Sequence, residues 1–182
     1  MEYVKQLDTC DYYHAMYDEL LDIIRDHKLN KEHQISLTSL EGEDDWLCSV
    51  GKMAELQHKE KFYSTINKSL KGSKIHQFIK SQPSFYRWRA MCINPGQAYS
   101  IHKDSQSGIT NIRCHVPLIT NDQANLMFFG KDLHNKNPVL YYLESGKVFE
   151  VNTSDYHTAV NFGNNDRWHI VGVKYEDSIY WS

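Results

Sequence analysis

The sequence predicts an α+β fold in which a mainly helical N-terminal half supports a double-stranded β-helix, the cupin-like jelly roll of two antiparallel sheets. Two observations predict it. Apolar residues recur at helical spacing within residues 1–84, whereas residues 85–182 contain short aromatic and β-branched runs separated by turn residues. The chain of 182 residues is long enough to form one domain with its own core, so we expect a single domain built from these two parts.

The helical elements are expected in the first half of the chain. Residues 11–28 place apolar side chains at intervals of three and four, which predicts a helix with Thr9 or Asp11 as its N-cap. Residues 34–40 alternate in the manner of a short strand. A second helical zone is expected over residues 59–81. These elements form the predicted outer support of the fold.

The second half of the sequence is typical of a series of short strands. Its apolar runs are separated by turn-forming sequences such as Pro95-Gly96 and Gly163-Asn164-Asn165. This spacing is typical of sheets that pack face to face in a sandwich or barrel. We expect strands at residues 86–93, 100–103, 111–119, 125–129, 139–143, 147–151, 158–161 and 168–175.

Composition and charge argue against several classes of function. A formal net charge of -3 provides no overall positive field for nucleic acid, so no nucleic-acid partner is expected. No apolar run has the length of a membrane span, and the acidic first 25 residues do not resemble a secretory signal. We therefore expect no membrane partner and a cytoplasmic location. The four widely spaced cysteines are expected to be reduced thiols, and the oligomeric state is left open by the sequence.

A His-x-Asp triplet and a later histidine form the candidate metal site. In His102-Lys103-Asp104 the first and third side chains share one face of an extended segment, because strand side chains alternate with period two. His157 lies at the head of another predicted strand. With ten histidines such a triplet also arises by chance, so its surroundings matter. Two imidazoles and one carboxylate leave open positions on an ion, as in non-haem Fe(II) oxygenases, and we predict that these three residues form the catalytic metal centre.

Arg167 is the first candidate for holding an anion near this centre. It follows His157 by ten residues and opens an apolar predicted strand. If that strand pairs near the strand of His157, the guanidinium can bind a carboxylate through two parallel hydrogen bonds, which suits the distal end of 2-oxoglutarate. An internal salt bridge to Asp155 or Asp166 is the alternative reading.

A further predicted strand places two polar residues on one face. Arg113 and His115 share that face, whereas Cys114, Val116 and Leu118 share the other and are expected in the core. The polar pair then either lines a cavity and donates to a carboxylate near the metal, or it faces solvent.

The stretch from about Arg89 to Lys174 resembles the aspartyl/asparaginyl β-hydroxylase family, which includes free-proline hydroxylases and depends on Fe(II) and 2-oxoglutarate. The match covers nearly half of the chain, and the order and spacing of its motifs make it specific. The matching segments are Asn94-Pro95-Gly96, His102-Lys103-Asp104, Arg113-Cys114-His115-Val116-Pro117-Leu118-Ile119-Thr120-Asn121, Ser145-Gly146-Lys147-Val148-Phe149-Glu150-Val151, His157-Thr158-Ala159-Val160-Asn161 and Asn165-Asp166-Arg167-Trp168-His169-Ile170-Val171.

The resemblance implies a dioxygenase that uses Fe(II), with 2-oxoglutarate and O2 as co-substrates, to hydroxylate an amino acid or an amino-acid residue of the proline, aspartate or asparagine type. It gives His102, Asp104 and His157 the iron-ligand positions and Arg167 the distal carboxylate of 2-oxoglutarate. Arg113 and His115 take positions near the metal-binding end of 2-oxoglutarate. Two alternatives remain open: a non-catalytic jelly-roll binding module, and a cupin-like hydrolase or isomerase that uses its metal as a Lewis acid.

The expected partner is a small amino acid or a peptide substrate. Because residues 85–182 form the predicted jelly roll, only residues 1–84 and the connecting loops remain to cover a substrate. Arg87 and Arg89 alternate with Tyr86 and Trp88, and they supply either a carboxylate contact with an aromatic wall or a solvated strand face.

Overall fold

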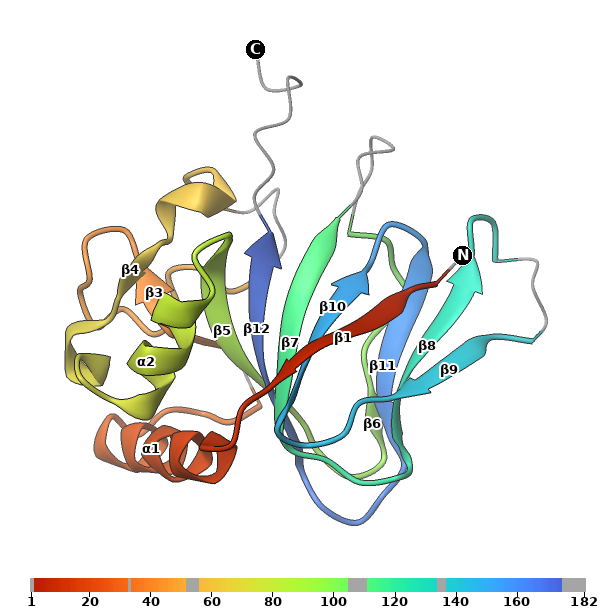
Figure 1. Ribbon diagram of the computed structural model, residues 1–182, viewed down its shortest axis with the longest axis horizontal. Coiled ribbons are helices and arrows are strands. Elements are labelled where there is room, and N and C mark those ends of the chain that lie inside the picture. Colours follow the sequence, from red (N-terminus) through yellow and green to blue (C-terminus); the bar gives the residue numbers. More distant parts are fainter. Residues whose placement is uncertain (1, 33, 52–55, 105–110, 134–136, 175–182) are drawn as a thin grey trace.

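Two antiparallel sheets face each other in the computed structural model, which describes residues 2–32, 34–51, 56–104, 111–133 and 137–174. The larger sheet has six strands in the order β1-β10-β7-β12-β5-β2, and the smaller has four in the order β6-β11-β8-β9. Figure 1 shows the two sheets as adjacent layers, with both α-helices on the outer side of the larger one. The predicted α+β fold with a jelly roll is confirmed.

The strand bounds are as follows. The larger sheet contains β1 (Val4–Thr9), β10 (Lys147–Asn152), β7 (Ile112–Ile119), β12 (Arg167–Lys174), β5 (Phe85–Ile93) and β2 (Ile35–Ser36). The smaller sheet contains β6 (Gln97–Ala98), β11 (Tyr156–Asn161), β8 (Ala124–Gly130) and β9 (Val139–Tyr142). A separate two-stranded ribbon pairs β3 (Thr38–Ser39) with β4 (Thr65–Ile66).

The two helices cover the outer face of the larger sheet. Helix α1 (Tyr13–Asp26) buries Met16 and Leu20, and helix α2 (Lys74–Ser81) buries Ile75, Phe78 and Ile79. Their apolar spacing of three and four residues places these side chains on one stripe. The carboxylate of Glu19 in α1 accepts hydrogen bonds from the first two backbone N–H groups of α2, at 2.7 and 3.0 Å. This contact satisfies donors that a helix start leaves without a partner and fixes the helices to each other.

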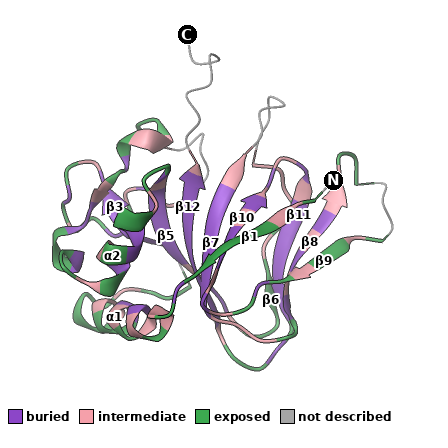
Figure 2. Ribbon diagram, viewed as in Figure 1, coloured by how far each residue is buried: buried purple, intermediate pink, exposed green. Residues whose placement is uncertain are grey.

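The core has two parts, one on each face of the larger sheet. Outward-facing side chains of β5, β7 and β12 pack under the helices and include Trp88, Val116 and Trp168. Gly172 leaves room for this layer, since a Cβ there would come within 2.8 Å of the Trp88 ring. A smaller apolar cluster fills part of the space between the two sheets and is Ile93, Leu126, Phe128, Leu143, Phe149, Val151 and Ala159. Figure 2 shows the central strands as buried and the outer surface of α1 as exposed.

Most predicted strands are confirmed, with small differences at their ends, and the segment beyond Lys174 lies outside the described residues. The predicted strand at residues 100–103 is wrong: β6 comes earlier, and His102 makes only an isolated bridge to His157. Residues 34–40 split into β2 and β3, which join different sheets. The run 59–81 is helical only in its last turns, because residues before α2 form the single turns η2 (Glu60–Phe62) and η3 (Lys68–Leu70) around strand β4.

Two details at the N-terminus also differ from the expectation. Strand β1 was not predicted, because it is an edge strand whose side chains are mostly exposed and therefore lack a clear alternation. Helix α1 begins after Tyr12, which makes no side-chain capping bond, so neither Thr9 nor Asp11 is the N-cap. Within the part of the chain that the structure describes, neither helix has the length and apolar character needed to cross a membrane.

Candidate metal centre

His102, Asp104 and His157 come together at one end of the space between the sheets. His157 is the second residue of β11, and its backbone exchanges two hydrogen bonds with the backbone of His102, at 3.0 and 2.9 Å. The potential ligand atoms of the three side chains all lie within 4.8 Å of one another. Among the described residues, no other cluster of His, Cys, Asp or Glu reaches this geometry. The local spacing that predicted the triad thus brings its side chains together.

Backbone carbonyls orient both imidazole rings. Nδ1 of His102 lies 2.8 Å from the carbonyl oxygen of Ser100, and Nδ1 of His157 lies 2.9 Å from that of Asp155. Because a carbonyl only accepts, each Nδ1 carries a proton, so the neutral form of each ring has its lone pair on Nε2. Nε2 of His102 faces Oδ1 of Asp104 at 3.4 Å. The rings are therefore held in the tautomer that coordinates a metal through Nε2.

The charge states also suit a cation. Burial raises the pKa of Asp104, but the charge of Arg113 and the hydrogen bond from His102 outweigh it and hold that pKa well below its usual range. Burial lowers the pKa of His157, so this ring is neutral at neutral pH. The hydrogen bond to Asp104 raises the pKa of His102. One carboxylate and one neutral imidazole are thus already in their metal-binding forms.

A buried charge network links Asp104 to the N-terminal half of the chain. Nε of Arg113 donates to Oδ2 of Asp104 at 3.1 Å, and Nη1 of Arg113 lies 3.4 Å from Oε1 of Glu60 in η2. The same Glu60 oxygen accepts a hydrogen bond from Nη1 of Arg87. Burial raises the pKa of Glu60, but Arg113 and Arg87 outweigh it and lower that pKa. Arg113 therefore holds a candidate ligand in place, and Glu60 holds Arg113.

The sequence contains no signal for the role of Glu60. It lies between two lysines in a segment that was expected to be helical, where a carboxylate is ordinary on a solvated face. Only the approach of η2 to the larger sheet brings it to Arg113. His169, in contrast, follows Arg167 at the spacing of two that also predicted the metal triplet, so period two could have found it.

Arg167 is a buried cation without a carboxylate partner among the described residues. Its side chain is 3% exposed, and Asp166 pairs with Lys31 while Asp155 accepts from Tyr3, so neither predicted alternative salt bridge forms. Burial lowers the pKa of Arg167 to about 10. A buried charge of this kind is costly unless an anion joins it.

His169 makes a polar contact with Arg167 and has a donor of its own that finds no partner among the described residues. Nη2 of Arg167 lies 3.2 Å from Nδ1 of His169. A guanidinium only donates, so Nδ1 of His169 accepts and its Nε2 carries the proton. Nε of Arg167 and Nε2 of His169 are both buried, and neither has a hydrogen-bond partner within the described residues. These two donors lie on one strand and can receive one carboxylate.

The condition considered for Arg167, a pairing of its strand with that of His157, is not met, because β12 and β11 belong to different sheets. Arg167 and His157 instead both face the interior between the sheets, where His115 interacts with each of them. His115 on β7 lies within the electrostatic influence of both Arg167 and His157, and burial followed by the charge of Arg167 holds its pKa well below the usual range. Its Nδ1 is 3.4 Å from that of His169. Arg113 and His115 therefore line the interior rather than face solvent, while Cys114 and its outward neighbours are in the core as predicted.

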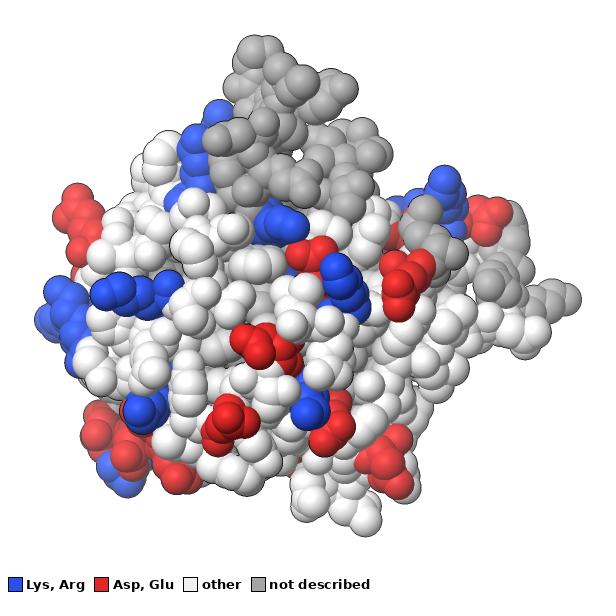
Figure 3. Space-filling model, viewed as in Figure 1, with Lys and Arg blue, Asp and Glu red and all other residues white. Residues whose placement is uncertain are grey.

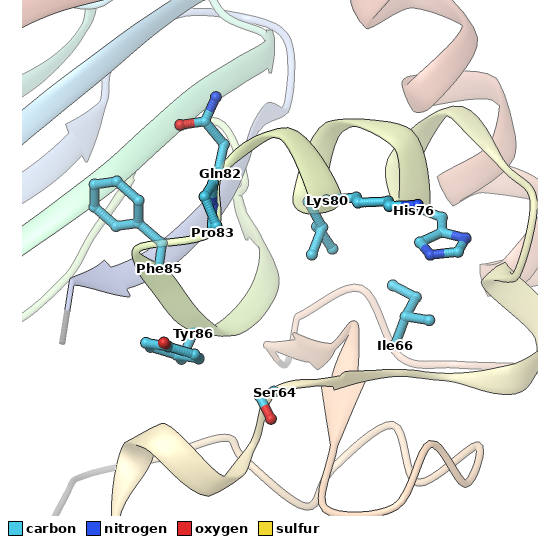
Figure 4. Close-up of a pocket in the computed structure, with 9 residues that line it drawn as sticks. Ser64, Ile66, His76, Lys80, Gln82, Pro83, Phe85 and Tyr86 are labelled. Carbon is cyan, nitrogen blue, oxygen red and sulfur yellow. The ribbon is translucent and has the colours of Figure 1, made fainter.

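Elsewhere on the surface the described residues offer less chemistry. An open hollow between α2, β4 and the start of β5 is lined by side chains that include His76, Lys80 and Tyr86 (Figure 4). It lies away from the metal triad and contains no carboxylate. On the face shown in Figure 3, positive and negative side chains are interspersed rather than gathered by sign. The four cysteines are free thiols, as expected.

No protein-family model matches the sequence, and no curated protein matches it. Solved structures do match. A Pseudomonas putida prolyl-4-hydroxylase aligns with a TM-score of 0.60 and 11% identity over 98% of this chain and 95% of that one. AviO1 from Streptomyces viridochromogenes Tue57 aligns with a TM-score of 0.56 and 11% identity over 97% and 91%. EvdMO1 gives a TM-score of 0.60 and 11% identity over 97% of this chain, which spans about half (48%) of its length. At this identity the likeness shows the fold alone.

Proposed function

We propose that the protein is an Fe(II)- and 2-oxoglutarate-dependent dioxygenase that hydroxylates an amino acid or an amino-acid residue. The observation that supports this most is the pairing of two features in one interior. A His-Asp-His triad suited to Fe(II) lies at one end, and the buried cation Arg167, which has no carboxylate partner among the described residues, lies on the facing sheet. A metal site alone fits several reaction classes. An additional buried anion site fits the binding of a dicarboxylate co-substrate.

The donor set fits the metal. Two Nε2 lone pairs and one carboxylate are the ligands of non-haem Fe(II) oxygenases and leave positions for co-substrate and O2. When bound, Fe(II) with 2-oxoglutarate and O2 supplies the oxidant for C–H hydroxylation, with succinate and CO2 as co-products. The protein contributes ligand geometry, in which Arg113 and the carbonyls of Ser100 and Asp155 fix the directions of the ligand side chains.

In this proposal, side chains on the inner faces of β7 and β12 bind the co-substrate. Arg167 and His169 would bind the distal carboxylate with the two donors that have no partner in the described protein. His115 lies between them and the metal and would contact the metal-binding end. The apolar cluster around Phe128 and Phe149 excludes water from this interior and strengthens each of these charged contacts.

Anaerobic addition of Fe(II) and then 2-oxoglutarate tests the proposal. The chelate of the two on the protein gives a weak visible charge-transfer band, and we expect this band for the parent protein. Succinate formation under air should then depend on both additions. A cupin-like hydrolase or a non-catalytic binding module would show neither the band nor succinate. The Asp104→Ala variant is the matched control, because it keeps the fold and loses a ligand.

A further inference from the structure

The two arginines that open β5 have different surroundings. Each guanidinium nitrogen of Arg87 has a partner within the protein. Nε donates to the carbonyl of Ser49 at 2.9 Å, Nη2 donates to that of Gly51 at 2.8 Å, and Nη1 pairs with Glu60. Its backbone φ of +50° lies at a register break between β5 and β12, which turns it away from the regular alternation. Arg87 is a structural residue.

Arg89 differs from Arg87 because it makes no contact ion pair within the described residues; the charges of Glu60 and Asp104 act on it only from farther away. The side chain is 6% exposed, and among the described residues its Nη1 donates a hydrogen bond to the neutral amide oxygen of Gln34 at 2.7 Å. Nε has no partner in the described part of the chain, and no carboxylate there lies within ion-pair distance. Burial, with Arg87 and Arg113 adding to it, lowers the pKa of Arg89 to about 9. Because Glu60 and Asp104 do not contact this guanidinium and burial outweighs their effect on its pKa, the charged side chain is costly to bury unless a further anion joins it.

The register places Arg89 on the metal side of the interior. Val171 of β12 pairs with Arg89 on one side and with His115 on the other, so these residues share one row across the sheet. Arg113, which holds Asp104, pairs at the next inner position, Val173. Arg167 pairs four residues farther along β5, a separation of roughly 13 Å between backbones at about 3.3 Å per residue. Arg89 and Arg167 therefore lie at different positions along the inner face of the larger sheet.

We propose that Arg89 binds a carboxylate of the primary substrate, which makes that substrate an organic acid: a free amino acid held by its α-carboxylate, or a peptide held by an acidic side chain. This inference rests on the proposed function. 2-Oxoglutarate has two carboxylates, of which one belongs to the metal end and the other to Arg167. Arg89 is left for an anion of a second molecule, on the side of the interior where Arg113 holds Asp104 of the candidate metal triad. Gln34 fixes the orientation of its guanidinium.

The experiment measures succinate release by the Fe(II)-loaded protein against paired compounds. Free amino acids, with proline, aspartate and asparagine first, are compared with their α-carboxamides. Capped peptides that contain aspartate are compared with the same peptides containing asparagine. We expect stimulation by one carboxylate and at least about a tenfold weaker response to its amide, since the amide cannot pair with a cation. The pair that responds identifies the source of the carboxylate. If only neutral compounds stimulate, or if none of the carboxylates does, the assignment of Arg89 is overturned.

The variants Arg89→Gln and Arg89→Lys separate substrate from co-substrate. For the stimulating carboxylate we expect Arg89→Gln to raise the apparent KM at least about 30-fold, since it removes one partner of a buried charge pair, and Arg89→Lys to recover part of this. The 2-oxoglutarate affinity, read from the anaerobic charge-transfer band, should change less than about threefold. Lys174→Gln, which removes an outer-face cation already paired with Glu150, is the control. An unchanged KM in Arg89→Gln, or an equal loss of 2-oxoglutarate affinity, refutes the assignment. A parent protein without the band refutes the proposed function and this inference together.

Discussion

Replacing Arg167 by Met should make the ligand-free protein more stable while it weakens 2-oxoglutarate binding. The pKa of Arg167 falls from 12.5 to about 10 because of burial, and at about 1.4 kcal/mol for each pKa unit this corresponds to about 3 kcal/mol. Both values lie far above 7, so at neutral pH the folded protein bears this whole cost of holding the charged form. Replacement even of buried ion pairs by apolar residues is often neutral or stabilising by roughly 1–4 kcal/mol in other proteins, and for a cation without a carboxylate partner we expect a gain in this range.

The same substitution removes one partner of the proposed carboxylate pair. Its loss costs about 2–5 kcal/mol, so the dissociation constant of 2-oxoglutarate should rise about 30-fold or more. Urea unfolding under argon, with saturating Mn(II) and with or without 2-oxoglutarate, measures both effects. At a concentration 100 times its dissociation constant, the ligand stabilises the parent by about 2.7 kcal/mol and the variant by no more than about 0.9 kcal/mol.

The matched control is Lys174→Met on the same strand. Lys174 already pairs with Glu150 at 3.0 Å and is partly exposed, so its removal should change stability by less than about 1 kcal/mol and leave the ligand effect intact. A ligand-free Arg167→Met variant that is less stable than the parent would contradict the idea of an unpaired buried charge. Parent-like stabilisation of the variant by 2-oxoglutarate would show that another group holds the distal carboxylate.

Three further predictions concern the metal end and the buried histidines. His102→Ala and Asp104→Ala should each abolish binding of Mn(II), followed by electron paramagnetic resonance, with unchanged circular dichroism, and retained binding by both would remove the triad from consideration. Glu60→Gln should weaken Mn(II) affinity about tenfold because its arginine partner then holds the ligand carboxylate less firmly; an unchanged affinity makes this contact structural only. Burial holds the pKa of His115 and His169 well below 6.5, so unfolded chains bind protons first and stability should fall as pH drops from about 7 to 5, with a shallower slope in His169→Gln.

The site residues that could be predicted from the sequence were found through a local pattern. His102 with Asp104, and Arg113 with His115, follow from the period-two alternation of extended chain, which needs no knowledge of tertiary structure. The structure brings His102 and Asp104 together with His157. It also buries Arg113 and His115 on the inner face of β7. His169 follows the same rule, so an alternation applied to every inward strand would have included it.

The features that were not predicted depend on contacts between residues that are far apart in the sequence. Glu60 contacts Arg113 from a single turn 53 residues earlier in the chain, and no periodicity marks a residue of this kind. The two arginines of β5 look alike in sequence, and only the carbonyls of Ser49 and Gly51, together with Glu60, make one of them structural. Strand β1 was missed because its pairing with β10 exposes nearly all of its side chains.

The position of β1 has a consequence for how the chain folds. Val4 pairs with Val151, and the neighbouring Tyr3 stacks on Phe128 and donates to Asp155, the residue whose carbonyl orients His157. Nearly 150 residues must therefore be present before the first strand can find its place, and closing so long a loop is slow. During synthesis, β1 leaves the ribosome long before its pairing partner β10 has been made. The contact of Tyr3 with Asp155, close to His157 of the candidate metal centre, is therefore expected to form late in folding, after the strands that carry the triad have paired.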